Sequence, residues 1–156
     1  REELEKWKNN YRVELNNRVK LFPRQDSILE YLQMTTCGIF ISRAEGWNLG
    51  CLEMMALGKQ VIATNYSGHT EYCNSSNAYL IDITEKEPAY DGKWFHGFGN
   101  WAKLGNQQQD QIIESLRDVY SKFHENKTFN SAGVRTAELF TFERTAKELY
   151  GIIRNV

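Results

Sequence analysis

Apolar and polar residues follow one another along the chain in two periods, one typical of buried strands and one typical of amphipathic helices. Short apolar runs are each followed by a segment with helical spacing. The runs expected to form strands are RVKLF (18–22), CGIFIS (37–42), QVIAT (60–64) and AYLIDI (78–83). This order predicts an α/β fold, a Rossmann-like parallel sheet with flanking helices, in which strands such as CGIFIS are buried on both faces.

Helical spacing marks several longer segments. They are EELEKWKNNY (2–11), a helix capped by Asp26 that runs through SILEYLQM (27–34), the segment from Asn48 to Gly58, QQQDQIIESLRDVYSKF (107–123), NSAGVRTAELF (130–140) and a last helix capped by Thr141. The sides expected to be buried are Ile28, Leu29 and Leu32 in the second helix, Leu49, Leu52, Met55 and Ala56 in the third, Ile112, Ile113, Leu116, Val119, Tyr120 and Phe123 in the fourth, and Ala146, Leu149, Tyr150 and Ile153 in the last. Residues 84–106, rich in glycine and aromatic residues, are expected to form a long functional or mobile loop.

The composition fits one globular domain and disfavours several classes of function. With 19 Lys+Arg against 20 Asp+Glu in 156 residues, no overall charge attracts nucleic acid or an acidic membrane, and neither is expected as a partner. No apolar run reaches the roughly 18 residues of a transmembrane segment. Cys37, Cys51 and Cys73 lack metal-ligand spacing and are expected to be buried thiols in a reducing, cytoplasmic environment. The scattered histidines favour no metal site.

The segment SRAEGWNLGCLEMMALGKQVIAT (42–64) carries the candidate chemistry. Its helix is expected to begin near Asn48, where the first N–H groups lack internal partners and attract a phosphate. Gly46 and Gly50 would let the backbone approach a diphosphate. Because helical side chains lean toward the helix start, Glu53 is expected to face the same cleft as Glu45 at the carboxyl ends of two strands. The loop at 65–69 is expected to converge on that site.

Chemistry alone leaves two explanations for the presence of these carboxylates. Carboxylates beside a diphosphate would accept hydrogen bonds from hydroxyls, which favours a ribose and a sugar. Glu45 and Glu53 would equally suit the positive end of a helix without any ligand. Taken alone, Trp47 is more typical of packing than of recognition, and His69 is more typical of an ordinary loop histidine.

The run EGWNLGCLE (45–53) resembles the E-x7-E motif of retaining, group 1 glycosyltransferases with the GT-B architecture. The surrounding order agrees, because RVKLF, a capped helix, CGIFIS, QVIAT, YSGHTEY and AYLIDI follow one another as in that family. The closing FTFERTAKELY (140–150) is also similar. Two departures are Trp47-Asn48 in place of a common Phe-Gly pair, and Ser67-Gly68 in place of Gly-Gly.

The resemblance implies a function and a set of site residues. The chain would bind a nucleotide diphosphate-sugar and transfer the sugar to an unknown acceptor, with no cofactor and no metal. Glu45 would be catalytic, beside the donor-sugar hydroxyls, and Glu53 would bind the ribose hydroxyls. The other expected donor-binding residues are Gly46, the backbone of Trp47, Asn48 and Leu49, and Arg24 near the base.

The family's donor domain begins with two strands that precede anything in this sequence. Residues 1–156 are therefore expected to be a partial nucleotide-sugar-binding domain, inactive by itself. The strands 18–22 and 37–42 would each expose an unpaired edge, to be covered by a missing N-terminal portion or by a second copy. The alternatives are a non-catalytic sugar-nucleotide-binding or interaction module of the same fold and, among enzymes, a GT-B epimerase, which lacks the E-x7-E context.

Overall fold

The computed structural model of the chain describes Phe22 and residues 27–154. The chain divides into two units, Arg1–Glu30 and Tyr31–Val156, and the second unit contains the sheet and the candidate site. Several sequence predictions fall outside the described residues. They are the helix at 2–11, the strand at 18–22 apart from Phe22, the cap at Asp26 and the base contact at Arg24.

Three parallel strands form the sheet of the second unit. They are β1 (Cys37–Phe40), β2 (Gln60–Thr64) and β3 (Tyr79–Ile81), in the spatial order β1-β2-β3. This parallel order confirms the α/β fold expected from the strand–helix alternation. Within the described residues β1 pairs only with β2, and Ile39 is 51% exposed. The expectation that this strand is buried on both faces is therefore wrong.

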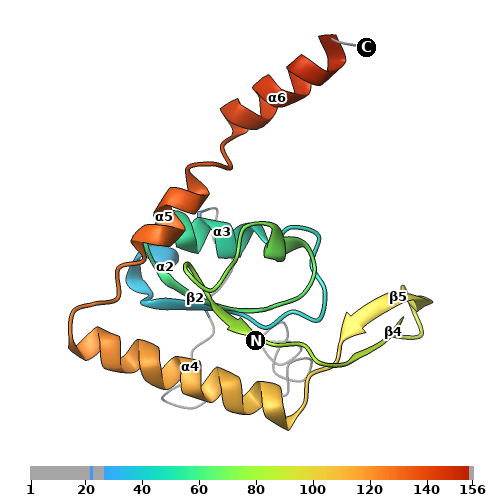
Figure 1. Cartoon of the computed structure of the whole chain (residues 1–156), viewed down its shortest axis with the longest axis horizontal. Coiled ribbons are helices and arrows are strands. Elements are labelled where there is room, and N and C mark those ends of the chain that lie inside the picture. The colour runs from blue at the N-terminus through green and yellow to red at the C-terminus, as the bar shows by residue number, and fades with distance from the viewer. Residues whose placement is uncertain (1–21, 23–26, 155–156) are drawn as a thin grey trace. The chain divides into compact units, whose positions relative to one another are not determined.

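Helices cover both faces of the sheet (Figure 1). On one face α3 (Leu49–Ala56) packs against β1 and β2, and α5 (Ser131–Ala137) packs against α3. On the other face α4 (Asn106–His124) packs against β2 and β3. The remaining helices are α2 (Leu29–Met34), the short 3₁₀ turn η1 (Gly68–Glu71) and α6 (Phe142–Arg154). The helices expected at these places are confirmed.

The buried side of α3 differs from the expected one. Leu49 is 62% exposed and Ala56 is exposed, whereas Leu52 and Met55 are buried as expected. The cluster around α3 consists of Cys51, Leu52, Met54, Met55, Val61, Ala63, Tyr72 and Cys73. The buried side is rotated from the expected one because Cys51 and Met54 are buried beside Leu52 and Met55. Cys51 and Cys73 are buried free thiols as expected, with their sulfur atoms 3.7 Å apart, whereas Cys37 is only partly buried.

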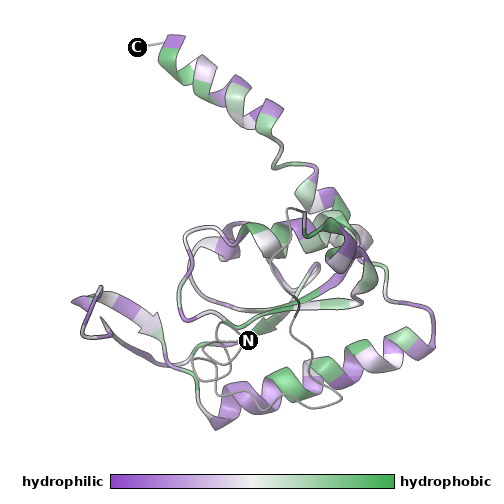
Figure 2. Ribbon diagram, turned by 180° about the vertical axis from the view of Figure 1, so that it is seen from behind, coloured by the Kyte–Doolittle hydropathy of each residue, from purple (hydrophilic) through white to green (hydrophobic). Residues whose placement is uncertain are grey.

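Three other expected inner faces are largely open to solvent. In α4 only Val119 of the expected stripe is buried, while Tyr120 is 67% and Phe123 52% exposed. No residue of α6 is buried, although Thr141 Oγ1 accepts from the Arg144 amide as the predicted cap. Of the α2 side, Leu32 packs on the core, but Ile28 and Leu29 are about half exposed. Figure 2 shows hydrophobic and hydrophilic residues alternating along α4 and α6.

Residues 84–106 form a hairpin rather than the expected irregular loop. Strands β4 (Lys86–Tyr90) and β5 (His96–Ala102) pair antiparallel, with Glu87 opposite Trp101. At the turn, Asp91 Oδ1 accepts hydrogen bonds from the backbone amides of Lys93, Trp94 and Phe95, at 2.8–2.9 Å. These bonds also lower the pKa of the Asp91 carboxyl. The prediction of a loop is therefore wrong, because an aspartate closes the turn of a two-stranded ribbon.

Candidate functional site

The loops that follow β1 and β2 are joined by hydrogen bonds at the carboxyl ends of these strands. The Glu45 amide donates to Ser67 Oγ at 2.8 Å, and the Gly68 amide donates to the Glu45 carbonyl at 3.0 Å. Further in, Thr64 Oγ1 donates to the Ser42 carbonyl at 2.7 Å. The expected convergence of the two loops is therefore confirmed, and its contacts are mostly to backbone groups.

The two loops approach so closely that only glycine fits at one of them. A Cβ added at Gly68 would lie 1.9 Å from the Gly46 carbonyl oxygen, far inside van der Waals contact. A Cβ added at Gly46 would meet nothing within 4 Å. The backbone at Gly46 is therefore in contact with the protein on one side and faces open space on the other.

Asn48 and Tyr72 hold the start of α3 in place. Asn48 has a left-handed backbone, with φ 63°, and its Oδ1 accepts from the Cys51 amide at 3.3 Å as the N-cap. The Tyr72 hydroxyl lies 2.8 Å from the Trp47 carbonyl and 2.7 Å from the Asn48 carbonyl. Burial raises the pKa of Tyr72, so this hydroxyl stays protonated as a donor.

The side chain of Trp47 belongs to an aromatic cluster. Its ring centroid lies 5.4 Å from those of Tyr72 and Phe140, which in turn contact each other. These tilted contacts are typical of packing. The ring therefore anchors the loop to the segment after α5, and only the Trp47 backbone remains as a candidate ligand contact.

The two glutamates have different surroundings. Glu45 is half-buried, and its Oε1 accepts from Ser42 Oγ at 2.6 Å, which fixes the carboxylate. Glu53 is exposed, and its side chain makes no hydrogen bond or ion pair with any described residue. Leu49, at the first turn of α3, is also exposed. Glu45 and Gly46 border the pocket described next, whereas Leu49 and Glu53 do not.

A pocket of about 490 Å³ lies between the loop after β1 and the hairpin. It is lined by Arg43, Ala44, Glu45, Gly46, Phe95 and Trp101. The Arg43 guanidinium carbon lies 4.3 Å from the centre of the Trp101 ring and the guanidinium forms an ion pair with Glu87. The Arg43 carbonyl accepts from the Ala102 amide at 2.8 Å. Sequence reasoning missed Arg43, Phe95 and Trp101, and the density of aromatic residues in 84–106 was the available signal.

His69 is a structural residue of this region. It is fully buried, and its Nε2 lies 2.5 Å from the Thr64 carbonyl oxygen. Because a carbonyl oxygen can only accept a hydrogen bond, Nε2 is the ring nitrogen that carries a hydrogen. Its Nδ1 is buried without a hydrogen-bond partner among the described residues. His69 thus supports the loop after β2, and we assign it no contact with a ligand.

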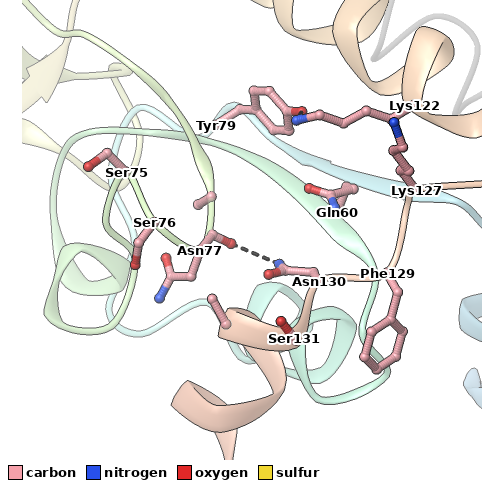
Figure 3. A pocket seen from close by; sticks show the side chains of 12 residues that line it. Gln60, Ser75, Ser76, Asn77, Tyr79, Lys122, Lys127, Phe129, Asn130 and Ser131 are labelled. Atoms are coloured by element: carbon pink, nitrogen blue, oxygen red, sulfur yellow. Dashed lines mark hydrogen bonds between the residues drawn. The ribbon is translucent and has the colours of Figure 1, made fainter. Parts of the chain in front are cut away.

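A second pocket, of about 340 Å³, lies at the opposite end of the strands (Figure 3). Gln60 and Tyr79, which begin β2 and β3, line it together with residues near the start of α5. Lys122 donates to the Tyr79 hydroxyl at 2.6 Å and pairs with Asp118 at 2.9 Å. Tyr79 first, and then Lys122, lowers the pKa of Asp118. Since the lysine is already paired and none of the predicted site residues is present, this pocket is not the predicted site.

In the same pocket the side-chain amide of Asn130 makes several hydrogen bonds to the backbone. Asn130 Nδ2 donates to the Asn77 carbonyl at 2.8 Å (Figure 3). Asn130 Oδ1 accepts from the Gly133 amide at 2.8 Å. Nδ2 also lies 3.2 Å from the Lys59 carbonyl. These contacts join α5 to the loops before β2 and β3, which is a structural role.

Two kinds of feature are absent from the described part of the chain. No group of three or more His, Cys, Asp or Glu side chains there could hold a metal ion. None of the helices described is both long and apolar enough to span a bilayer.

Comparison with known proteins gives a family match. The model of the family described as "Glycosyl transferases group 1" matches residues 1–90, which is more than half of the chain. The match includes both loops of the site and α3, and it ends with β4. No curated protein matches the chain.

Proposed function

The chain belongs to the group 1 glycosyl transferases, and on this premise we propose that it binds the nucleotide diphosphate-sugar donor of a retaining sugar transfer. The observation that carries the proposal is the joined pair of loops at the carboxyl ends of β1 and β2. There the open side of Gly46 and the carboxylate of Glu45 border one pocket. Ligands of open α/β sheets bind at this end of the strands.

The diphosphate lies at the start of α3 in this proposal. The first amides of the helix have no partners inside it and carry the positive end of its dipole. Gly46 and the backbone of Trp47, Asn48 and Leu49 are the proposed contacts, and the absence of a side chain at Gly46 leaves room for phosphate oxygens. Arg24 is the proposed contact of the base. No cofactor is required, because the donor itself carries the group to be transferred.

The two carboxylates bind hydroxyl groups in this proposal. Glu45 accepts from the donor sugar, and its hydrogen bond from Ser42 fixes its orientation before the sugar binds. Glu53 accepts from the ribose, and its exposed side chain is available for that contact. During transfer the bond from the anomeric carbon to the diphosphate breaks, an acceptor hydroxyl takes its place on the same face, and the hydroxyl proton leaves with the diphosphate.

Titrations of the full chain with UDP-glucose, GDP-mannose and ADP-glucose test the proposal. Glu53→Gln is expected to weaken the tightest of these ligands about 10- to 100-fold, because a hydrogen bond to a charged acceptor is worth about 1.5–3 kcal/mol. Its melting temperature should stay unchanged, because the Glu53 side chain is exposed. Glu114→Gln, a matched change at an exposed position of α4, should affect neither quantity.

Two outcomes would count against the proposal. Unchanged affinity together with a lower melting temperature for Glu53→Gln would support the alternative in which this glutamate only stabilises the helix. Loss of binding on addition of EDTA, restored by Mg²⁺ or Mn²⁺, would contradict the metal-free site.

A further inference from the structure

We infer that the β4–β5 hairpin supplies the wall against which the pyranose ring of the donor packs, with Phe95 and Trp101 as residues that determine sugar binding. The inference rests on the proposed function, because it places the sugar in the pocket that Glu45 borders. It adds the turn of the hairpin and β5 (His96–Ala102), which lie beyond the family match that ends at residue 90.

The position of the hairpin is set by contacts to the loop after β1. The Ala102 amide donates to the Arg43 carbonyl at 2.8 Å, and Tyr66, from the loop after β2, donates through its hydroxyl to the Asn100 carbonyl at 2.8 Å. The Trp101 ring contacts both the Arg43 guanidinium and the Phe95 ring, whose centroid lies 5.1 Å from its own. The end of β5 is therefore held beside both loops of the site.

The charges of the pocket favour a hydroxylated ring over a phosphate. Among the residues that the structure describes, Arg43 is the only cationic one that lines this pocket, and its guanidinium is already paired with Glu87 and covered by Trp101. The remaining charged group is the Glu45 carboxylate, which repels phosphate and accepts from hydroxyls. The diphosphate is thereby directed toward the start of α3, and the sugar toward the hairpin.

The aromatic residues provide the apolar surface that the faces of a pyranose ring require. A sugar ring has C–H groups on its faces and hydroxyls around its edge, so it pairs with an apolar aromatic surface and a carboxylate at once. Phe95 is 47% exposed and Trp101 is half-buried, so both rings retain surface toward the pocket. Exposed aromatic residues next to a few polar groups are typical of such ligand sites.

The test compares a nucleotide sugar with its own nucleoside diphosphate. The full chain is titrated with UDP and UDP-glucose, GDP and GDP-mannose, and ADP and ADP-glucose. Phe95→Ala is expected to weaken the sugar conjugate about tenfold and to leave the nucleoside diphosphate unchanged. Trp101→Ala should act in the same direction. Phe98→Ala is the matched control, because Phe98 lies in the same hairpin, is 88% exposed and does not line the pocket.

The possible results separate this inference from the proposed function. If the unmodified chain binds none of the six probes, both fail together. If it binds them and Phe95→Ala weakens neither ligand, or weakens both equally, the hairpin inference is wrong and the donor site stands. Should Trp101→Ala lower the melting temperature, Phe95→Ala decides the matter, because it leaves the contact between Arg43 and Trp101 in place.

Discussion

The loop after β1 and the β4–β5 hairpin border the same pocket, but the rest of the protein holds them very differently. The loop is fixed by backbone contacts to Ser67 and Gly68, by the Tyr72 hydroxyl and by an aromatic cluster around Trp47. The hairpin is a two-stranded ribbon whose aromatic side chains are mostly exposed, and it is attached chiefly at the end of β5.

This difference indicates a division of labour. The part of the ligand that all donors share, the diphosphate, is proposed to contact the fixed loop, where small displacements would be costly. The part that varies, the sugar, is proposed to contact the hairpin, where side chains can change at little cost in stability. Substitutions that disturb these loop contacts should therefore affect folding, and substitutions of exposed side chains in the hairpin should affect binding alone.

Gly68→Ala should have the largest effect. The new methyl group would overlap the Gly46 carbonyl, and the two loops would have to separate. We expect a loss of roughly 3 kcal/mol in the free energy of unfolding, as for severe overpacking of a rigid site. Urea denaturation followed by circular dichroism measures it. A loss below about 0.5 kcal/mol would mean that the loops are not held together as described.

Tyr72→Phe comes next, because it removes one hydroxyl and keeps the ring. The Trp47 carbonyl would lose its hydrogen-bond donor, whereas the Asn48 carbonyl would keep only the Cys51 and Leu52 amides. The expected cost is about 1–3 kcal/mol. The same denaturation experiment measures it, with Tyr150→Phe, an exposed tyrosine of α6, as the control. Equal effects of the two substitutions would show that the Tyr72 hydroxyl does not support the loop.

Gly46→Ala should leave stability unchanged, because its methyl group would point into open space. If phosphate oxygens occupy that space, the affinity for the nucleoside diphosphate should fall, by about tenfold for a clash worth 1.4 kcal/mol. Calorimetric titration with UDP, GDP and ADP measures the change. Undiminished affinity for the tightest of them would remove the diphosphate from this side of Gly46.

The regular part of the fold was predictable because its signals are local. Apolar runs of strand length marked β1, β2 and β3, and the order of strands and helices indicated the parallel sheet and the meeting of the two loops. Periodicity also marked α4 and α6, but it reports which side of a helix is apolar and not what covers that side. Tyr120 and Ile153 accordingly fit the pattern and are exposed.

The missed parts of the site depend on contacts between segments far apart in the sequence. Nothing near Trp47 indicates that Phe140 packs on its ring, and nothing near Arg43 indicates that Trp101 covers it. The hairpin was hidden because the glycines at 92, 97 and 99 take positive φ angles and interrupt the alternation by which a strand is identified.

Hydrogen–deuterium exchange of the full chain, with and without ligand, tests the division of the pocket most directly. A nucleoside diphosphate should slow amide exchange in residues 45–52 and leave the hairpin unchanged, whereas the matching nucleotide sugar should also slow exchange in residues 91–102. Slower exchange around the pocket at the amino ends of β2 and β3, with residues 45–52 unchanged, would contradict the account.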